Sequence, residues 1–227
     1  MLRPGKDKGI ATPLPLGLAA LGATAFLIGA GAVFQSPVTW SPYLMQALLF
    51  GGLIELLAGM WAFAYGDPLA ATTFSFMGAF FAWWGFIQLP LLAGHAAATA
   101  VSANSTAMVF IVSGVVMLCV WIASFYEFAA FNLVLLFLWP GLILGGIASF
   151  NGNMVLRLIG GIALIVSGLT AGYALFADLY NSARLEEVVP LGEFKEMRTR
   201  AEQDEMERIR RTHPGNHAEH GAEARRA

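Results

Sequence analysis

Residues 127–180 contain two long apolar runs that meet at a short polar break. The stretch reads EFAAFNLVLLFLWPGLILGGIASFNGNMVLRLIGGIALIVSGLTAGYALFADLY, and the break is Asn151-Gly152-Asn153. A helix needs roughly 20 mainly apolar residues to cross about 30 Å of hydrocarbon. The runs on both sides of the break reach that length. The stretch therefore predicts two membrane-spanning helices joined by a tight turn.

The same apolar character extends over most of the chain. Of its 227 residues, 57% are hydrophobic and 12% are charged, and the mean hydropathy is +0.65. Soluble domains usually carry about 25% charged residues. The ionised residues between positions 9 and 183 are Glu55, Asp67, Glu127, Arg157 and Asp178. This composition excludes a water-soluble globular protein.

Proline, glycine and small polar clusters divide the apolar region into six segments. They cover residues 14–34, 43–65, 68–92, 106–125, 127–149 and 154–180. Backbone groups in hydrocarbon must pair internally, and long apolar runs favour helices over the ten-residue alternating strands of a barrel. The predicted fold class is an all-α membrane protein with a bundle of six transmembrane helices. The first run is longer than a secretory signal core of about 7–15 residues, so we expect it to be retained.

Basic residues lie at the two ends of the apolar region. They are Arg3, Lys6 and Lys8 before it and Arg184, Lys195, Arg198 and Arg200 after it. Lys and Arg mark the cytoplasmic side, and the connections expected on the other side contain neither residue. We therefore expect a multi-pass protein of the plasma (inner) membrane with both termini in the cytoplasm.

The charge distribution also predicts three parts of the chain. Residues 1–11 form a cytoplasmic tail, residues 12–183 the six-helix transmembrane domain, and residues 184–227 a charged cytoplasmic tail. Within this tail, residues 193–212 are typical of a solvated helix. The tail also holds His213, His217 and His220, which have metal-ligand chemistry. Flexible tails of this composition are usually disordered, so no metal site is predicted.

Few residues offer catalytic or cofactor chemistry. Cys119 is the single cysteine, which excludes an intrachain disulfide and a cysteine metal site. His95 is the one histidine before the tail, and no nucleophile elbow or phosphate-binding loop is present. We therefore expect no enzyme activity, cofactor or metal. The net charge of −2 and the scattered basic residues argue against a nucleic-acid partner.

Three ionisable residues of the apolar segments are candidates for function, because a charge is costly in hydrocarbon. Glu55 lies well inside the second segment and either carries protons or joins two helices as a hydrogen-bonded acid. Asp178 lies near the cytoplasmic end of the last segment and is a second candidate for proton coupling. Arg157 lies near the opposite end of that segment, where it either attracts an anion or extends toward lipid headgroups.

Interrupted helix ends and hydroxyl groups supply candidate contacts for a solute. Pro13, Pro15 and Gly17 fit a helix start, whose dipole suits an anion. The amides of Asn151 and Asn153 either line a pore mouth or cap the last helix. Hydroxyl groups are a further set of candidates for the path, although each can instead hydrogen-bond to its own helix backbone. These are the hydroxyls of Thr24, Thr72, Thr73 and Ser75.

A series of motifs resembles the acetate uptake transporter family, the succinate–acetate permeases. Pro13-Leu14-Pro15-Leu16-Gly17-Leu18 is similar to the N-P-A-P-L-G-L opening of that family, with Thr12 at the Asn position. Further matches follow in order up to residue 193. They are Gly51-Gly52, Ala58-Gly59-Met60-Trp61, Gly66-Asp67, Thr72-Thr73-Phe74-Ser75, Gly78-Ala79-Phe80, Asn151-Gly152-Asn153 and Val189-Pro190-Leu191-Gly192-Glu193.

The resemblance implies six-helix protomers in a homo-hexamer within the lipid bilayer, each with its own path for acetate and protons. It also implies a constriction, made in the family by Phe, Tyr and Leu, at Leu21, Met77 and Leu138 of this chain. Two of these three positions differ from the family pattern, and Met77 lacks the Tyr hydroxyl. A Gln position of the family corresponds to Glu55, and Asp178 matches a family acid.

From residues and resemblance together we expect a permease for short monocarboxylates, most plausibly acetate with succinate as a further substrate, taken up with protons. One alternative is a non-transporting assembly or sensory protein that acts through its charged C-terminal tail. The other is a channel for a different small solute on the same scaffold.

Overall fold

The computed structural model describes residues 11–34, 45–92, 103–184 and 188–192. Its elements are α1 (Leu14–Phe34), η2 (Gln46–Ile54), α3 (Glu55–Tyr65), α4 (Pro68–Leu92), α5 (Ala103–Ala123), η4 (Ser124–Tyr126), α6 (Ala129–Asn151) and α7 (Met154–Arg184). Six helices of this part are long and apolar enough to cross a membrane. The predicted all-α bundle of six transmembrane helices is confirmed.

The second membrane span combines two helix types. Residues 46–54 form the π-helix η2, which continues directly into α3 at Glu55. A π-helix is rare, and where it occurs it is frequently found at a functional site. Glycines Gly51 and Gly52 of this π-helix are buried against α1 and α4. The second span is therefore irregular where these two glycines pack against α1 and α4.

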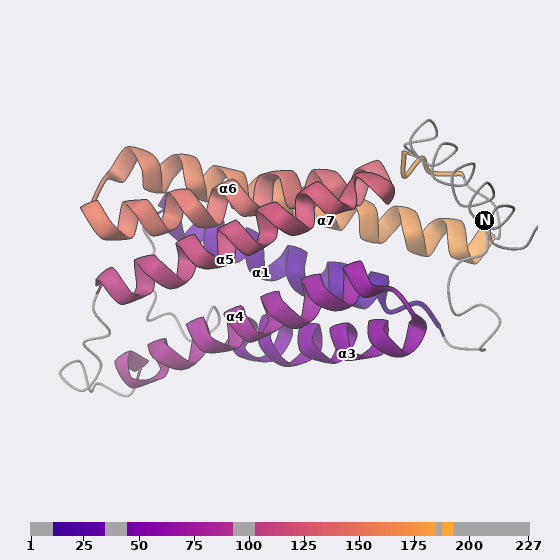
Figure 1. The fold of residues 1–227 in the computed structure, drawn as a ribbon, viewed down its shortest axis with the longest axis horizontal. Coiled ribbons are helices and arrows are strands. Elements are labelled where there is room, and N and C mark those ends of the chain that lie inside the picture. Colours follow the sequence, from indigo (N-terminus) through magenta and orange to yellow (C-terminus); the bar gives the residue numbers. More distant parts are fainter. Residues whose placement is uncertain (1–10, 35–44, 93–102, 185–187, 193–227) are drawn as a thin grey trace, which may run out of the picture. The chain divides into compact units, whose positions relative to one another are not determined.

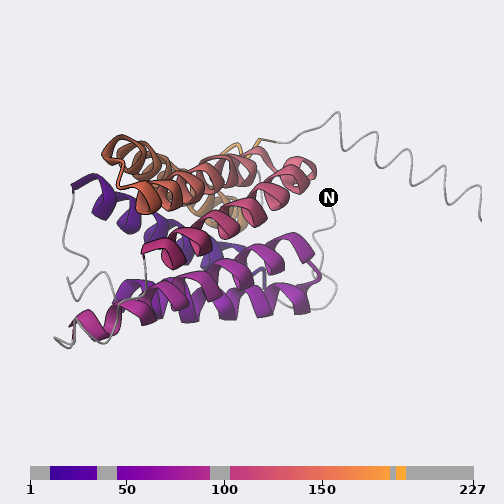
Figure 2. The ribbon, with the colours of Figure 1, turned by 60° about the vertical axis from the view of Figure 1, so that its left-hand side comes forward.

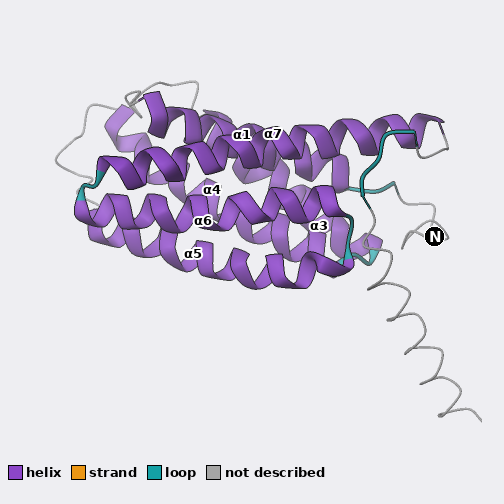
Figure 3. Cartoon of the chain, turned by 90° about the horizontal axis from the view of Figure 1, so that it is seen from above, coloured by secondary structure: helices purple, strands orange, loops and turns teal. Residues whose placement is uncertain are grey.

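The helices pack as a chain of neighbouring pairs. α1 lies along α7, α7 along α6, and α6 along α5, while η2 and α3 pack on α4. Figures 1 and 2 show α3 and α4 side by side, and Figure 3 shows α1 next to α7. α1 also contacts η2 and α3, but α4 and α5 have only slight contact. α1 thus joins the two groups of helices.

Glycines allow α1 and α7 to approach closely. A Cβ atom on Gly168 would lie 2.7 Å from the carbonyl oxygen of Gly22, and one on Gly161 would lie 3.0 Å from that of Gly29. Small residues of this kind let transmembrane helices pack backbone to backbone. Gly172 differs, because no described atom lies within 4 Å of a Cβ at that position. Packing within the protomer thus explains most of the glycines of α1 and α7, with Gly31 on α1 as a second position where a Cβ meets no described atom.

Local capping residues end the helices and set the turns. Gly66 ends α3 with φ 91°, and the Oδ1 atom of Asp67 accepts a hydrogen bond of 2.9 Å from the backbone N–H of Ala70 in α4. Gly152 ends α6 with φ 68°, a left-handed conformation that glycine adopts at low cost. The α6–α7 turn therefore lies at the polar break that the sequence predicted.

A short segment after α7, residues 188–192, is named here the strap. The backbone N–H groups of Ala129 and Ala130 at the start of α6 donate to the carbonyl oxygens of Gly192 and Leu191, over 2.6 and 2.9 Å. The first N–H groups of a helix have no partner within it, so the strap caps α6. The hydroxyl of Tyr173 donates to Pro190 O at 2.6 Å and ties the strap to α7 as well.

Residues 1–192 make one compact unit, and residues 193–227 make a second. Several predictions lie outside the described residues: those on the N-terminal tail, on His95, on the helix over residues 193–212 and on the tail histidines. Within the described residues, no group of three or more His, Cys, Asp or Glu is placed to hold a metal ion.

Candidate functional site

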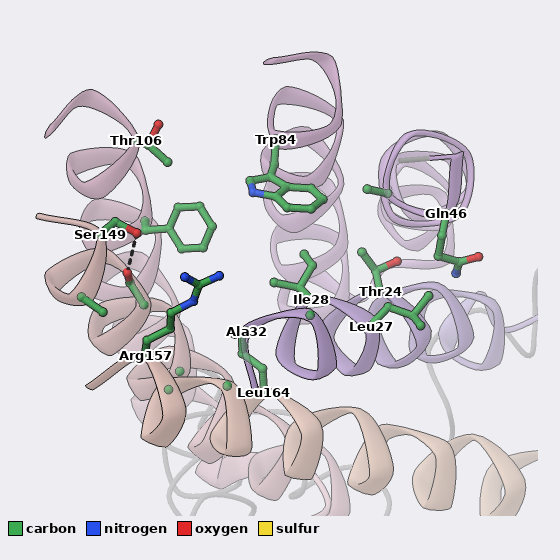
Figure 4. Close-up of a pocket in the computed structure, with 18 residues that line it drawn as sticks. Thr24, Leu27, Ile28, Ala32, Gln46, Trp84, Thr106, Ser149, Arg157 and Leu164 are labelled. Atoms are coloured by element: carbon green, nitrogen blue, oxygen red, sulfur yellow. Dashed lines mark hydrogen bonds between the residues drawn. The ribbon is translucent and has the colours of Figure 1, made fainter. Parts of the chain in front are cut away.

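A cavity of about 280 Å³ opens between the helices, and all six membrane spans contribute to its walls (Figure 4). α1 lines it with its second half, from Thr24 to Ala32, and α7 with its first turns, from Arg157 to Leu164. α6 contributes residues near its C-terminal end, up to Ser149. The cavity therefore lies toward the end of the bundle where α1 and α6 end and α7 begins.

The cavity walls are mainly apolar, with a few polar groups. The larger apolar side chains are Leu27, Ile28, Trp84, Phe110 and Leu164. The polar side chains are Thr24, Gln46, Thr106, Ser149 and Arg157. Apolar walls with a few convergent polar groups are the common form of a small-molecule site.

Arg157 is the one ionisable residue among the described residues that line the cavity. Its backbone N–H donates to Asn153 O at 3.1 Å in the first turn of α7. Figure 4 shows its guanidinium group pointing into the space between α1 and α6. No described residue accepts a hydrogen bond from the guanidinium or pairs with its charge. The Arg157 side chain is exposed, so attraction of an anion and extension toward lipid headgroups both stay predictions.

Leu21, Met77 and Leu138, the residues of the predicted constriction, are each 0% exposed and belong to one hydrophobic cluster. Leu21 precedes the cavity residue Thr24 by three positions, and Leu138 precedes Gly141 of the cavity by the same number. At 1.5 Å per residue, each leucine lies roughly 4.5 Å deeper along its helix than the cavity residue. The three residues thus belong to the apolar core next to the cavity, and the constriction they form stays a prediction.

Glu55 is completely buried, and no described residue donates a hydrogen bond to either carboxyl oxygen. Its neighbour Leu56 touches α4, because a Cβ on Gly78 would lie 2.7 Å from the backbone nitrogen of Leu56. Gly78 directly follows Met77. The carboxyl group therefore belongs to the same depth of the bundle as Met77, without lining the cavity. Asp178 is also fully buried, but near the far end of α7.

Of the four hydroxyl residues predicted to line the path, one lies at the cavity and three lie elsewhere on α4. Thr24 lines the cavity, is 1% exposed, and its buried Oγ1 atom has no hydrogen-bond partner among the described residues. Thr73 is buried and its hydroxyl donates to Leu69 O at 2.8 Å, whereas the exposed Thr72 donates to Pro68 O at 2.8 Å. Ser75 packs against Gly59, and its Oγ atom also lacks a described partner. Only Thr24 of these four lies at the cavity.

The amides between α6 and α7 cap the turn. Oδ1 of Asn153 accepts hydrogen bonds from the backbone N–H groups of Val155 and Leu156, at 2.9 and 3.2 Å. Oδ1 of Asn151 accepts one from the backbone N–H of Asn153 at 3.0 Å. Both side chains are exposed and neither lines the cavity. The structure thus shows the capping role, and a contact with solute at the pore mouth stays a prediction.

The opening motif starts α1 instead of forming part of the cavity. The carbonyl of buried Pro13 accepts a hydrogen bond of 3.0 Å from the backbone N–H of Gly17, and Pro15 lies in the first turn. Gly17 packs against the ring of Phe74 on α4, where any larger side chain would collide. Pro13 and Pro15 therefore belong to the start of α1, and Gly17 allows α1 to pack against α4.

Sequence reasoning missed Gln46, Thr106 and Ser149, which also line the cavity. Ser149 and the cavity glycines Gly145 and Gly141 are four residues apart on one face of α6, a spacing that indicates a common face. The hydroxyl of Ser149 donates to Gly145 O at 2.9 Å. Gln46 and Thr106 carry no comparable signal, because their place depends on how separate helices pack.

Six membrane spans around an internal cavity, with a fully buried apolar cluster behind it, define a multi-pass membrane protein of the transporter or channel class. Comparison with known proteins identifies the family. The profile of the GPR1/FUN34/yaaH family matches residues 1–194. The chain belongs to this family, whose characterised members are transporters and channels and not enzymes.

Three proteins with similar sequences are named for the transport of small solutes. Acetate permease A of Emericella nidulans is 29% identical over 230 residues, covering 91% of this chain and 76% of that protein. The succinate-acetate/proton symporter SatP of Escherichia coli is 25% identical over 189 residues, covering 81% and 96%. Ammonia transport outward protein 3 of Saccharomyces cerevisiae is 29% identical over 182 residues, covering 74% and 62%.

A solved structure, that of the bacterial acetate channel SatP, has the same fold. It superposes with a TM-score of 0.75 at 23% identity, over 81% of this chain and 99% of that chain. The sequence-derived resemblance to the acetate uptake family is thereby confirmed.

Proposed function

We propose that this protein is a plasma-membrane permease for short monocarboxylates, with acetate as its main substrate and succinate as a possible further one. The observation that carries the proposal is the cavity, in which one cationic side chain lines a mainly apolar wall next to the apolar core that contains Leu21, Met77 and Leu138. Family membership and the names of the relatives support the same substrate class.

Proton coupling follows from the chemistry of this route. The pKa of a short carboxylic acid is close to those of Asp and Glu, so protonating it at pH 7 costs about 4 kcal/mol. Moving an unpaired carboxylate through an apolar region costs more than that. A substrate therefore crosses the cluster most easily as the neutral acid. The contact between Leu56 and Gly78 puts Glu55 near the depth of Met77 in the bundle, and Glu55 is the proposed proton carrier. Asp178, near the far end of α7, is proposed as a second group for proton coupling.

The assembly proposed here is a homo-hexamer with a path in each protomer, as the family resemblance implies. Both termini lie in the cytoplasm in this proposal, so the cavity faces outward. The N-terminal end of α1 and the C-terminal end of α7 lie at the same end of the bundle in Figure 1, as an even number of spans requires. We also propose that residues 1–11 form a cytoplasmic tail, residues 12–183 the six-helix transmembrane domain, and residues 184–227 a charged cytoplasmic tail.

A second candidate is a channel for another small solute. One relative is named for ammonia transport. An ammonium ion, however, would be repelled by Arg157 at the cavity, so this candidate requires the neutral ammonia molecule. The third candidate, a non-transporting assembly or sensory protein, would depend on the C-terminal tail and would need no solute path.

The experiment that tests the proposal is uptake of labelled acetate into liposomes that contain the purified protein. An inward proton gradient is imposed, and unlabelled propionate, lactate, succinate, urea or ammonium is added as a competitor. Saturable, gradient-driven uptake that monocarboxylates inhibit is the expected result. Inhibition by ammonium alone would favour the second candidate. Absence of all uptake by a folded, inserted protein would overturn the transport assignment.

A further inference from the structure

The positive charge of Arg157 at the cavity has no acidic partner among the described residues that line it. Arg157 is the single Lys or Arg between positions 9 and 183, and no acidic side chain lines the cavity among the described residues. The acidic groups of the described membrane spans, Glu55 and Asp178, are buried and do not line it. The electrostatic character of the cavity is therefore set by Arg157 alone, and it favours an anion.

A second polar group points to a ligand independently. Thr24 lines the cavity, and its Oγ1 atom, which is buried beside Gly51, has no described hydrogen-bond partner. A buried hydroxyl without a partner is costly, so such groups usually bind something. Figure 4 shows Thr24 and Arg157 on different helices around the same space. The cavity therefore offers a ligand a guanidinium group from α7 and a hydroxyl group from α1.

Size and wall chemistry narrow the class of ligand. The volume of about 280 Å³ lies just below the roughly 300–1,000 Å³ of most small-molecule sites. Apolar groups such as Ile28, Trp84 and Phe110 make up much of the wall. The second carboxylate of a dicarboxylate would lie against these apolar groups, and no second cationic side chain among the described lining residues would neutralise it. The cavity therefore suits a small anion with one carboxylate and a short hydrocarbon part.

We infer that the cavity is a capture site that binds a short monocarboxylate in its ionised form, with the carboxylate on the Arg157 guanidinium and the hydrocarbon part against the apolar wall. This inference rests on the proposed function and extends it, because it separates two states of the substrate. The anion is bound in the cavity, and the neutral acid passes the apolar cluster. The proton is taken up by the carboxylate between these two points, and no other covalent bond changes.

Binding is tested directly, apart from transport, by saturation-transfer NMR with propionate on the full-length protein in lipid nanodiscs at pH 7. Propionamide, which has nearly the same shape and no charge, is the ligand control. Arg157→Met is the test variant. Arg184→Met is the matched protein control, because it removes an Arg from the other end of α7, where the side chain is exposed and stacks on Tyr180. Arg157→Lys keeps the charge without the planar fork.

The wild type and Arg184→Met are expected to bind propionate in preference to propionamide. Arg157→Met is expected to lose at least about tenfold in propionate affinity, because a hydrogen bond to a charged group is removed. Arg157→Lys is expected to retain part of that affinity. Lowering the pH toward the pKa of propionate should reduce the difference between wild type and Arg157→Met, since the neutral acid gains little from a cation.

Two outcomes overturn the inference: equal propionate binding by wild type and Arg157→Met, or no preference of the wild type for propionate over propionamide. A failure of the proposed function gives a different result. In that case the wild type binds propionate through Arg157, but liposomes that contain it accumulate no carboxylate. Thermal melting of each variant identifies any loss of fold. If Arg157→Met does not fold, Arg157→Lys still tests whether the shape of the guanidinium group contributes to propionate affinity.

Discussion

Glu55 lies next to Leu56, which touches Gly78 at a contact between the second and third spans. Its carboxyl group is buried without a described hydrogen-bond partner. If it carries the proton, Glu55→Gln should abolish pH-driven acetate accumulation, because the amide cannot bind and release a proton. The protein should remain folded, since glutamine has nearly the same size and no charge to bury. Acetate accumulation in liposomes with an inward proton gradient measures the effect.

Asp67→Asn is a suitable control for Glu55→Gln. It makes the same acid-to-amide change at the turn between α3 and α4, and asparagine also caps a helix well. Its accumulation should match that of the wild type. Normal coupling in Glu55→Gln would return Glu55 to a structural role between helices.

Leu138 is completely buried in the cluster with Leu21 and Met77. Shortening it to alanine should widen the predicted constriction and increase the uptake of larger carboxylates, such as succinate, relative to acetate. The same change should cost about 2–5 kcal/mol of stability, as is usual for a buried leucine. The ratio of labelled succinate to acetate uptake is the measurement. Leu133→Ala, on the same helix but 40% exposed, should leave that ratio unchanged. An unchanged ratio in Leu138→Ala would contradict the placement.

Individual residues differ in how well the sequence predicted them. Glu55 and Arg157 were found because a charge in an apolar segment is conspicuous. Leu21, Met77 and Leu138 came from the family resemblance, because three apolar residues in apolar segments carry no signal of their own. The hydroxyls were ambiguous for a physical reason. A Thr in a helix can bond to the carbonyl four residues before it, and Thr72 and Thr73 do so while Thr24 does not.

At the scale of elements, Asn181 makes three of the hydrogen bonds that hold the strap. The Oδ1 atom of Asn181 accepts 2.9 Å hydrogen bonds from the N–H groups of Val188 and Val189, and its Nδ2 donates to Val189 O at 2.8 Å. Asn181→Ala should lower stability by about 1–3 kcal/mol and release the cap of α6. Faster hydrogen exchange at the amides of Val188, Val189, Ala129 and Ala130 would show the release.

Asn181→Asp provides a matched comparison, because it keeps the acceptor oxygen for two N–H groups and loses only the donor. Exchange at Val188 and Val189 should therefore remain slow in this variant. Equally fast exchange in both variants would mean that the donor alone holds the strap.

The length and order of the spans were predictable, because a helix that crosses the hydrocarbon must contain about 20 mainly apolar residues, and such runs are visible in the sequence. The π-helix over Gln46–Ile54 was not, since nothing in its apolar composition distinguishes it from an α-helix. The capping role of Asn153 was one of two open interpretations, and the observed bonds to Val155 and Leu156 show it. The cavity was not predicted as a whole, because its walls come from all six spans.

At the scale of the whole molecule, Gly172 has no explanation within the protomer. A glycine in an exposed helix interior costs about 1 kcal/mol relative to alanine. No described atom lies near it, and Leu169, Tyr173 and Phe176 around it are exposed. Small residues on such a face promote helix association in membranes. Gly172→Leu should therefore leave the protomer folded but yield smaller assemblies than the proposed hexamer in native mass spectrometry. A hexamer that persists would show that this face meets lipid.

Gly168→Leu is the counterpart to this variant, four residues earlier on α7. A Cβ there would lie 2.7 Å from the Gly22 carbonyl oxygen and from Cβ of Phe26. The larger side chain should force α1 and α7 apart and lower thermal stability strongly. The two variants thus separate packing inside the protomer from contact between protomers.

The C-terminal tail distinguishes a permease from a protein that acts through a cytoplasmic partner. The last described contacts of the compact unit are those of the strap, which ends at Gly192, and residues 193–227 make a separate unit. Deleting residues 195–227 therefore preserves every contact that caps α6 and removes none of the described cavity residues. If transport is the function, the truncated protein should keep most of its acetate uptake in liposomes, with the same inhibition by propionate. A folded truncated protein without uptake would mean that the tail takes part in transport. Full uptake in liposomes with loss of function only in cells would assign the tail a separate partner.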